Sequence, residues 1–317
     1  MAQQTWSIGE PQKLGFEAPV NRLRVRVLGG TVNVVGVEEG PARLEVSEVD
    51  GPPLQIVQDG DTVTVSYEDL PWNGSHGLRE WFDSKPWEKW RSLAGDGSGS
   101  GQGRKAWERS AAVTLTVPVG TNVQIAAVGA TAFVSGISGG TEIHGVTGDT
   151  TLVRLSGSVR ARTVSGSVEA QSVDGDFGFR SVSGGLTLVD GAAGAVRAES
   201  VSGDMLLDLA PAAATPERPV SISLNSVSGQ VAIRIPHPAD ARVEASTTSG
   251  GVSNAFEDLR VTGRFGSKRI TGTLGAGTGT LRATTVSGAI ALLRRPDADA
   301  DSDAAPETPA PLDKKVL

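Results

Sequence analysis

A row of hydroxyl side chains is the most regular set of polar groups in this sequence. Ser or Thr stands directly before glycine at Thr147, Ser165, Ser183, Ser202, Ser228, Ser249, Thr271 and Ser287. Such a row could bind a repetitive ligand, for example a glycan or an ice-like lattice. Each hydroxyl could instead cap the backbone of its own turn, as Ser and Thr do beside glycine. We favour the capping role.

Acidic side chains near the turns raise the question of calcium, because nonapeptide β-rolls bind Ca²⁺ through Asp residues at their turns. The acids concerned are Asp149, Asp174, Asp176, Asp190 and Asp204. They do not recur at one position of the repeat, and the most uniform turns carry Ser where a ligand would be needed. The sequence therefore predicts no metal site in the repeat.

The three histidines, His76, His144 and His237, lie far apart in the sequence, and we expect His144 at the surface beside a strand. No Ser-His-Asp arrangement, phosphate loop or metal-binding His pair is apparent. Residues 275–279, Gly-Ala-Gly-Thr-Gly, superficially resemble a phosphate loop, but no Lys-Ser or Lys-Thr follows, so we interpret them as a turn. No pair of acids is singled out for polysaccharide cleavage. We expect no catalytic residue, no cofactor and no enzyme activity.

A tryptophan-rich segment, residues 70–110, differs abruptly in composition from its surroundings. Its spacing and Pro86 predict two short helices, and residues 95–103 predict a flexible Gly/Ser linker. The candidate binding residues are Trp72, Trp81, Phe82, Trp87, Trp90 and Trp107. They could bind a protein partner, enter a membrane interface beside basic residues, or cover an open end of the fold.

The composition of the chain limits the kinds of binding partner and the cellular compartment that we expect. The 317-residue chain has a net charge of −7 and no cysteine. We find no basic stripe to neutralise phosphates, so a general nucleic-acid binder is not expected. Without cysteine there are no disulfides, zinc thiolate sites or thiol nucleophiles. Because the sequence has no signal-peptide pattern and no apolar run of membrane-spanning length, we expect a cytoplasmic protein, with peripheral membrane association still open.

The elements that must position these residues are β-strands. Residues 1–69 predict five or six strands, since Leu23, Val25 and Val27 alternate with arginines. Farther along, a nine-residue unit recurs, in which two inward apolar residues precede a turn with glycine. The inward pairs are Val159 and Ala161, Val168 and Ala170, Phe177 and Phe179, Leu186 and Leu188, and Val196 and Ala198. Such units predict a parallel β-solenoid in which each coil is buried by its neighbours.

The turns of the repeat fall into two alternating sets. One set varies in length, from Gly157 and Gly175 to the loop 211–219. The other is uniform and contains Gly148, Gly166, Gly184, Gly203, Gly229, Gly250, Gly272 and Gly288. Two alternating sets predict two strands per coil of about 18 residues, with rungs about 4.8 Å apart. We expect positive φ at the uniform glycines.

Four regions follow from these patterns. They are an N-terminal β-strand region (1–69), the Trp-rich helical insert with its linker (70–110), the β-solenoid (111–295) and an acidic tail (296–317). The tail is rich in Asp, Ala and Pro and has almost nothing to bury, so we expect it to be disordered.

Short repeated strings carry a family resemblance. Thr-Val-Ser-Gly or Ser-Val-Ser-Gly occurs at 163–166, 181–184, 200–203, 226–229 and 285–288, and a glycine-rich string occurs at 272–279. From Leu23 to Leu293 the chain resembles the bacterial DUF4097 family of β-strand-repeat proteins, also named putative adhesins, and its Trp-rich insert is similar to the actinobacterial branch. The resemblance implies a β-repeat fold and supplies no catalytic residues. Some relatives are envelope-stress or cell-surface proteins.

Together, these observations favour a non-enzymatic binding or scaffold protein. Its strand surface and the Trp-rich insert would bind a protein partner. The alternative is a peripheral membrane or envelope-stress component resembling an adhesin. A polysaccharide-acting β-helix enzyme is the third hypothesis.

Overall fold

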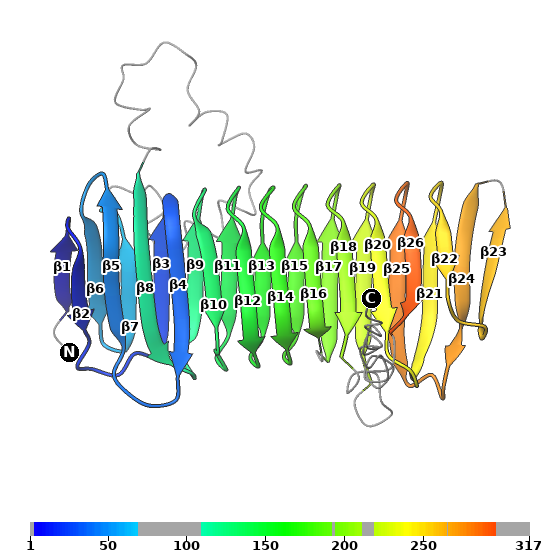
Figure 1. Ribbon diagram of the computed structural model, residues 1–317, viewed down its shortest axis with the longest axis horizontal. Coiled ribbons are helices and arrows are strands. Elements are labelled where there is room, and N and C mark those ends of the chain that lie inside the picture. Colours follow the sequence, from blue (N-terminus) through cyan, green and yellow to red (C-terminus); the bar gives the residue numbers. More distant parts are fainter. Residues whose placement is uncertain (1–2, 69–108, 192–193, 211–218, 265, 296–317) are drawn as a thin grey trace, which may run out of the picture.

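The computed structural model describes residues 3–68, 109–191, 194–210, 219–264 and 266–295. They form two long β-sheets that face each other, and the strands run across the long axis of the molecule (Figure 1). These ranges contain no helix, so the all-β expectation is confirmed for them. The expected helical insert and acidic tail fall on residues 69–108 and 296–317, which lie outside the described part.

One sheet contains fourteen strands and the other contains twelve. In spatial order the larger sheet consists of β1 (Gln4–Ile8), β6 (Leu54–Asp59), β7 (Thr62–Ser66), β3 (Arg22–Val27), β9 (Asn122–Ala127), β11 (Thr141–Gly145), β13 (Val159–Arg162), β15 (Phe177–Arg180), β17 (Ala195–Ser200), β19 (Ser221–Ser226), β25 (Gly279–Thr285), β21 (Ala241–Thr247), β24 (Ser267–Leu274) and β23 (Leu259–Arg264). The smaller sheet consists of β2 (Gln12–Gly15), β5 (Arg43–Asp50), β8 (Ser110–Pro118), β4 (Gly29–Val37), β10 (Thr131–Ser135), β12 (Thr150–Leu155), β14 (Val168–Val173), β16 (Leu186–Gly191), β18 (Met205–Leu209), β20 (Val231–Ile235), β26 (Ile290–Arg294) and β22 (Val252–Asn254).

Each coil of the repeat contributes one strand to each sheet. β11 pairs in parallel with β13, with Thr141 opposite Val159, and β13 pairs with β15, with Val159 opposite Phe177. Both steps advance by 18 residues, which confirms the predicted two strands per coil. A longer step follows at the variable edge, where Val196 of β17 lies opposite Ile222 of β19.

The core lies between the sheets and is built from every second residue of each strand. In β14, Val168, Ala170 and Val173 are buried, whereas Glu169 and Gln171 are exposed. All ten predicted inward residues, from Val159 to Ala198, are buried. Because side chains alternate between the two faces of a strand, the same pattern places the remaining residues on the outer surface.

At both ends, the order of strands in space departs from their order in the chain. β3 and β4 lie between the pair β7/β8 and the pair β9/β10, and β25 and β26 separate β19/β20 from β21/β22. Antiparallel strands flank the outermost coils, namely β1, β2, β5 and β6 at one end and β23 and β24 at the other. Residues 4–66 contain seven strands, where five or six were expected.

The glycines of the uniform edge are required by contact between coils, and the expectation of positive φ there is wrong. Positive φ occurs at other glycines, such as Gly30 and Gly60. A Cβ on Gly184 would lie 2.1 Å from the carbonyl oxygen of Gly166, closer than any real Cβ contact. The same approach to a neighbouring coil is found at Gly148, Gly166, Gly203, Gly229, Gly250 and Gly288. A side chain at these positions would push the coils apart.

Gly272 was expected among the glycines of the uniform edge, but it does not lie there. It lies within β24, opposite Val243 of β21 and Leu259 of β23. Because β24 runs antiparallel to both neighbours, the coil pattern is interrupted at this point.

The longest insertion, between β7 and β8, occurs at the edge whose turns were expected to be uniform. β7 ends at Ser66 in the larger sheet, and β8 begins at Ser110 in the smaller sheet. This connection runs in the same direction as the uniform turns, which also lead from the larger sheet to the smaller one. β7 pairs with β3, so the insertion begins beside that strand.

Candidate functional site

Arginine side chains gather on the outer face of the larger sheet. In β3, Leu23 and Val25 are buried in the core, so Arg22, Arg24 and Arg26 project from the opposite face. The pairing register continues this face from β3 to β21. The charged residues on it are the arginines Arg22, Arg24, Arg26, Arg160, Arg162, Arg180, Arg197, Arg242 and Arg282 and the glutamates Glu142, Glu199 and Glu244.

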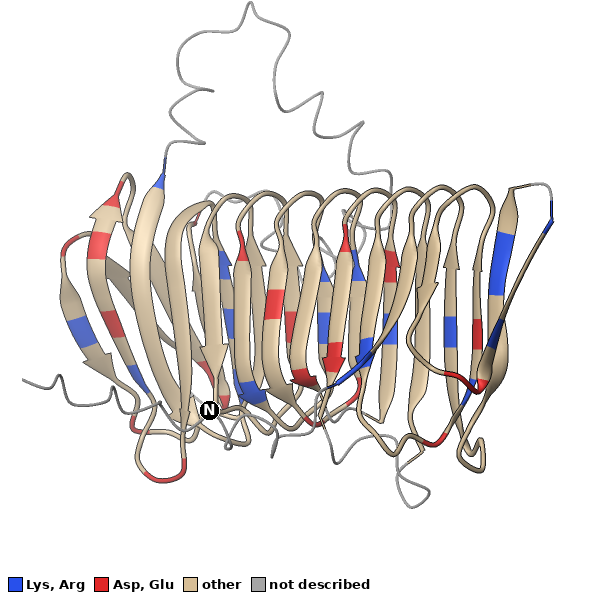
Figure 2. Cartoon of the chain, turned by 45° about the vertical axis from the view of Figure 1, so that its right-hand side comes forward, with Lys and Arg blue, Asp and Glu red and all other residues tan. Residues whose placement is uncertain are grey.

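The outer face of the smaller sheet has a different character. Its strands present mainly uncharged side chains, for example Phe133, Val153, Thr187 and Leu206. Figure 2 shows basic and acidic residues interspersed on the strands along the molecule. A chain with a net charge of −7 therefore carries one arginine-rich face. The expectation that the protein has no basic stripe is wrong.

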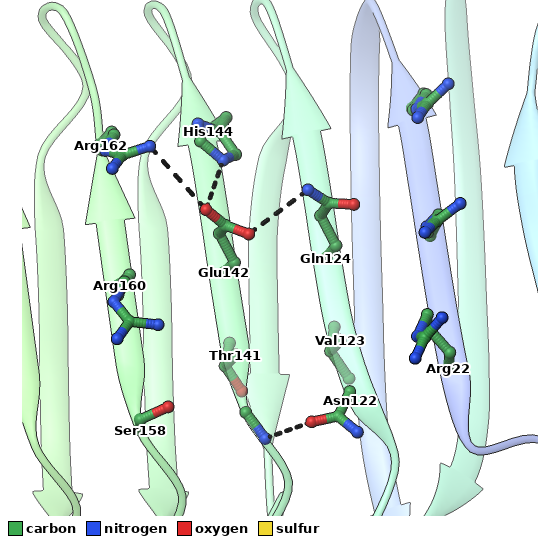
Figure 3. A pocket seen from close by; sticks show the side chains of 13 residues that line it. Arg22, Asn122, Val123, Gln124, Thr141, Glu142, His144, Ser158, Arg160 and Arg162 are labelled. Carbon is green, nitrogen blue, oxygen red and sulfur yellow. Dashed lines mark hydrogen bonds and ion pairs between the residues drawn. The ribbon is translucent and has the colours of Figure 1, made fainter. Parts of the chain in front are cut away.

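A groove of about 760 Å³ is hollowed into this face (Figure 3). Four adjacent strands supply its lining, in the order β3, β9, β11 and β13. The polar lining residues, from one wall to the other, are Arg22, Arg24 and Arg26, then Asn122, Gln124, Thr141, Glu142 and His144, and then Ser158, Arg160 and Arg162. We call this feature the arginine groove.

Glu142 is the one carboxylate among the described lining residues of the arginine groove. Its Oε1 lies 3.1 Å from Nε2 of His144 and 3.9 Å from Nη1 of Arg162. Its Oε2 accepts a hydrogen bond of 3.4 Å from Nε2 of Gln124. The hydrogen bond with His144 is the main cause that lowers the pKa of Glu142, and the charges of His144, Arg162 and Arg160 add to it. Glu142 is therefore an ionised carboxylate whose oxygens are already engaged.

His144 lies in β11 with a side chain that is 3% exposed, so its expected place at the surface is wrong. Its neighbour across β9 is Arg26, which is also buried. Burial is the main cause that lowers the pKa of Arg26, and the charge of Arg24 acts in the same direction. The positive charges of Arg24 and Arg26, at alternate positions of β3, therefore repel each other.

The loop that resembles a phosphate-binding loop encloses a carboxylate of its own chain. The backbone N–H and the hydroxyl of Thr278 both donate to Asp240, each at 2.9 Å. Gly275 and Gly277 have φ of 60° and 73°, which lets the backbone turn around this carboxylate. The hydrogen bond from the Thr278 N–H is the main cause that lowers the pKa of Asp240. The interpretation as a turn is confirmed.

A second charged cluster connects the end of the C-terminal strand β26 to coils formed earlier in the chain. Arg295, directly after β26, lies 2.6 Å from Asp190 and 3.2 Å from Asp208, and it donates a 2.8 Å hydrogen bond to the carbonyl of Leu209. Arg234 of β20 holds the other oxygen of Asp208 at 2.8 Å. The cluster bridges β16, β18, β20 and β26 along the smaller sheet, so we assign it a structural role.

The hydroxyl row on the uniform edge connects neighbouring coils. Seven of its members donate to a valine carbonyl, and for Ser183 the acceptor is Val164 at 3.2 Å. The hydroxyl that caps the backbone of its own turn stands two residues before Ser183. It belongs to Ser181, which accepts a 2.7 Å hydrogen bond from the N–H of Gly184. The capping role thus belongs to a different hydroxyl, and each hydroxyl of the row donates to the backbone of an adjacent coil, which for Ser183 is the preceding one.

The residues predicted for binding cannot be placed, whereas the arginine groove was missed. Trp72, Trp81, Phe82, Trp87, Trp90 and Trp107 all lie outside the described residues. Two sequence signals pointed to the groove: Arg22-x-Arg24-x-Arg26, and Arg160-x-Arg162 at the coil position one period after Glu142-x-His144. Neither signal alone says that the two arginine sets flank the same depression.

The family of the chain follows from its repeat. The model of a family described as Toastrack DUF4097 matches residues 121–293, more than half of the 317-residue chain. The chain belongs to the Toastrack DUF4097 family. The resemblance inferred from the Ser-Val-Ser-Gly strings is confirmed. In this Toastrack protein the matched range contains β9, β11 and β13 of the arginine groove, whereas β3 precedes it.

Three solved structures are similar to this Toastrack protein. A putative adhesin from Bacteroides fragilis has 12% sequence identity and a TM-score of 0.44, covering 90% of this chain and 98% of its own. A putative lipid binding protein from Parabacteroides distasonis has 10% identity and a TM-score of 0.38, covering 92% and 98%. A putative cell adhesion protein from Clostridium sporogenes has 10% identity and a TM-score of 0.27, covering 90% and 100%. A comparison with curated proteins found no match.

No helix suited to crossing a lipid bilayer occurs in the described ranges.

Proposed function

We propose that this Toastrack protein is a non-enzymatic binding protein that holds an anionic protein partner in the arginine groove. The observation that carries the proposal is the position of five arginines around one depression in a chain whose net charge is −7. The guanidinium group is suited to this role, because its planar set of donors matches carboxylate and phosphate groups and stays charged at neutral pH.

The chemistry of the groove supports binding rather than catalysis. Hydrolysis of glycosides needs two carboxyl groups on opposite sides of the scissile bond. The described lining supplies one, Glu142, and its oxygens already contact His144, Gln124 and Arg162. A carboxylate held in this way serves to arrange the neighbouring side chains.

The Trp-rich insert is proposed to add contacts with the same partner. Its connection begins at β7, which pairs with β3, the strand that carries one wall of the arginine groove. Tryptophan is frequent among the residues that dominate protein interfaces. Deletion of residues 72–107 should then weaken capture of the partner, and unchanged capture would remove the insert from the binding site.

Binding to defined anions tests the proposal. The wild-type protein is titrated with labelled polyglutamate, heparin, polyphosphate and vesicles of anionic lipid at low ionic strength. A double variant, Arg24→Glu with Arg160→Glu, changes both walls of the groove. Its matched control, Arg197→Glu with Arg242→Glu, makes the same charge change on the same face outside the groove.

We expect the wild type to bind polyglutamate, the groove variant to bind it at least about tenfold more weakly, and the control to lose much less. Melting temperatures of the three proteins establish that they are folded. If the wild type binds none of the anions, or if both variants lose affinity equally, the proposal is wrong. Binding to vesicles alone would contradict it and favour the peripheral membrane role.

A further inference from the structure

The two walls of the arginine groove lie opposite each other in the sheet. The register runs from Arg24 through Gln124 and Glu142 to Arg160. Three steps between neighbouring strands, each about 4.8 Å, place the backbones of the walls roughly 14 Å apart. An extended polypeptide with its side chains directed to both sides fits a space of this width.

The spacing along each wall matches that of an extended chain. Arg22, Arg24 and Arg26 project from alternate residues of β3, so they repeat about every 6.6 Å. Side chains on one side of an extended peptide repeat at the same interval. A peptide parallel to the strands would direct its odd-numbered side chains to β3 and its even-numbered side chains to β13.

The floor of the groove suits a peptide backbone. Asn122 and Gln124 of β9 present amide groups. Gln124 Nε2 already donates to Glu142 and Asn122 Oδ1 accepts from Gly140, so Gln124 Oε1 is offered to a peptide N–H and Asn122 Nδ2 to a peptide carbonyl. None of the described lining residues is Phe, Tyr or Trp, so a nucleic-acid base finds no such ring on which to stack. The apolar side chain among the described lining residues, Val123, is buried in the core and is not positioned to enter a lipid bilayer.

We propose that the arginine groove binds an extended acidic peptide segment of about five consecutive Asp or Glu residues, aligned with the strands between β3 and β13. The inference rests on the proposed function and specifies the chemistry and conformation of the partner. Alternate carboxylates pair with Arg22 and Arg24 on one side and with Arg160 and Arg162 on the other, while the buried Arg26 lies at the end of the first wall. Glu142 remains bound to its own neighbours.

Two peptides of equal composition test this arrangement by fluorescence anisotropy. One contains five consecutive Glu residues flanked by Gly and Ser, and the other has the same residues with each Glu separated by three neutral residues. We expect the consecutive peptide to bind the full-length protein at least about fivefold more tightly. Arg24→Gln and Arg160→Gln should each weaken this binding severalfold, whereas Arg242→Gln should not.

Residues 297–307 of the chain are themselves rich in Asp, so a version ending at Pro296 is measured alongside the full-length protein. It should bind the peptide at least as tightly. Equal affinity of the two peptides, or loss of affinity with Arg24→Gln but not with Arg160→Gln, would overturn the extended two-wall arrangement.

The outcome separates this inference from the proposed function. If neither peptide binds but polyphosphate, heparin or an oligonucleotide binds in a manner sensitive to Arg24→Glu with Arg160→Glu, the acidic peptide is the wrong ligand and the groove is still an anion site. If no anion binds, both proposals are wrong.

Discussion

The Ser-Val-Ser-Gly string shows how single residues determine the contacts between coils. In residues 181–184, the first Ser accepts from the glycine N–H, and the second donates to Val164 of the preceding coil. Val182 is 51% exposed and packs little. Gly184 is present because the carbonyl of Gly166 occupies the space of a Cβ. Three of the four positions therefore have a physical requirement. The cap recurs at Ser200, Ser226, Thr247 and Thr285, whereas Thr163 makes no such hydrogen bond.

Gly184→Ala should destabilise the protein by about 1–3 kcal/mol, because the added methyl must push back the backbone of the neighbouring coil. Gly178→Ala is the matched control: a Cβ there has no neighbour nearer than 3.8 Å. The control should leave stability unchanged or raise it slightly. Urea unfolding measures both variants. Equal midpoints for Gly184→Ala and wild type would contradict the assigned contact.

Glu142→Gln should lower the melting temperature at neutral pH and have no such effect in acid. The folded-state pKa of Glu142 lies below its ordinary value of 4.5. Its stabilisation is therefore present above that pH and is lost as pH falls through the lowered value. Because the side chain is 41% exposed, we expect less than about 1 kcal/mol. Melting curves at pH 7 and pH 3 measure the effect, and a difference that does not change with pH would refute it.

At the scale of elements, the turns predicted the coil but not the ends of the molecule. Two alternating turn sets were enough to infer two strands per coil, because the repeat fixes the register of β11, β13 and β15. At the two ends of the molecule, strands pair with partners that are not one coil away in the chain. β19 and β25 lie side by side although Ser221 and its partner Thr280 are far apart in the chain. Such pairings depend on tertiary packing, which has no periodic signal in the sequence.

The cluster around Arg295 should stabilise in particular the coils that contain β20 and β26. Arg295→Ala removes contacts with Asp190, Asp208 and Leu209, and we expect a loss of about 1.5–3 kcal/mol. Amide exchange should accelerate in β20 and β26 and remain unchanged in β12 and β14, because coils in a solenoid are stabilised mainly by their neighbours. The control, Arg294→Ala, changes an exposed residue of β26. Uniform acceleration along the whole molecule would contradict a local role.

At the scale of the whole molecule, the site arises from an uneven distribution of charge. Alternation in the sequence already placed Arg22, Arg24 and Arg26 on one face of a strand. The sequence could not place Arg160 opposite Arg24, because β3 pairs with β9, whose partner residue Gln124 lies 100 positions later in the chain. The net charge of −7 describes the whole chain, so it gave no sign that arginines outnumber glutamates on the outer face of the larger sheet.

The salt dependence of polyglutamate binding distinguishes control by the net charge from binding in the arginine groove. If the net charge of −7 governed encounters, polyglutamate would be repelled most strongly at low ionic strength. If the arginine groove binds it, affinity should rise as salt is lowered, because less screening strengthens the contacts. The measurement is the dissociation constant of labelled polyglutamate between 20 and 300 mM NaCl. We expect tighter binding at low salt for wild type and a much weaker dependence on salt for Arg24→Glu with Arg160→Glu. Absence of binding at low salt, or the same trend in both proteins, would contradict it.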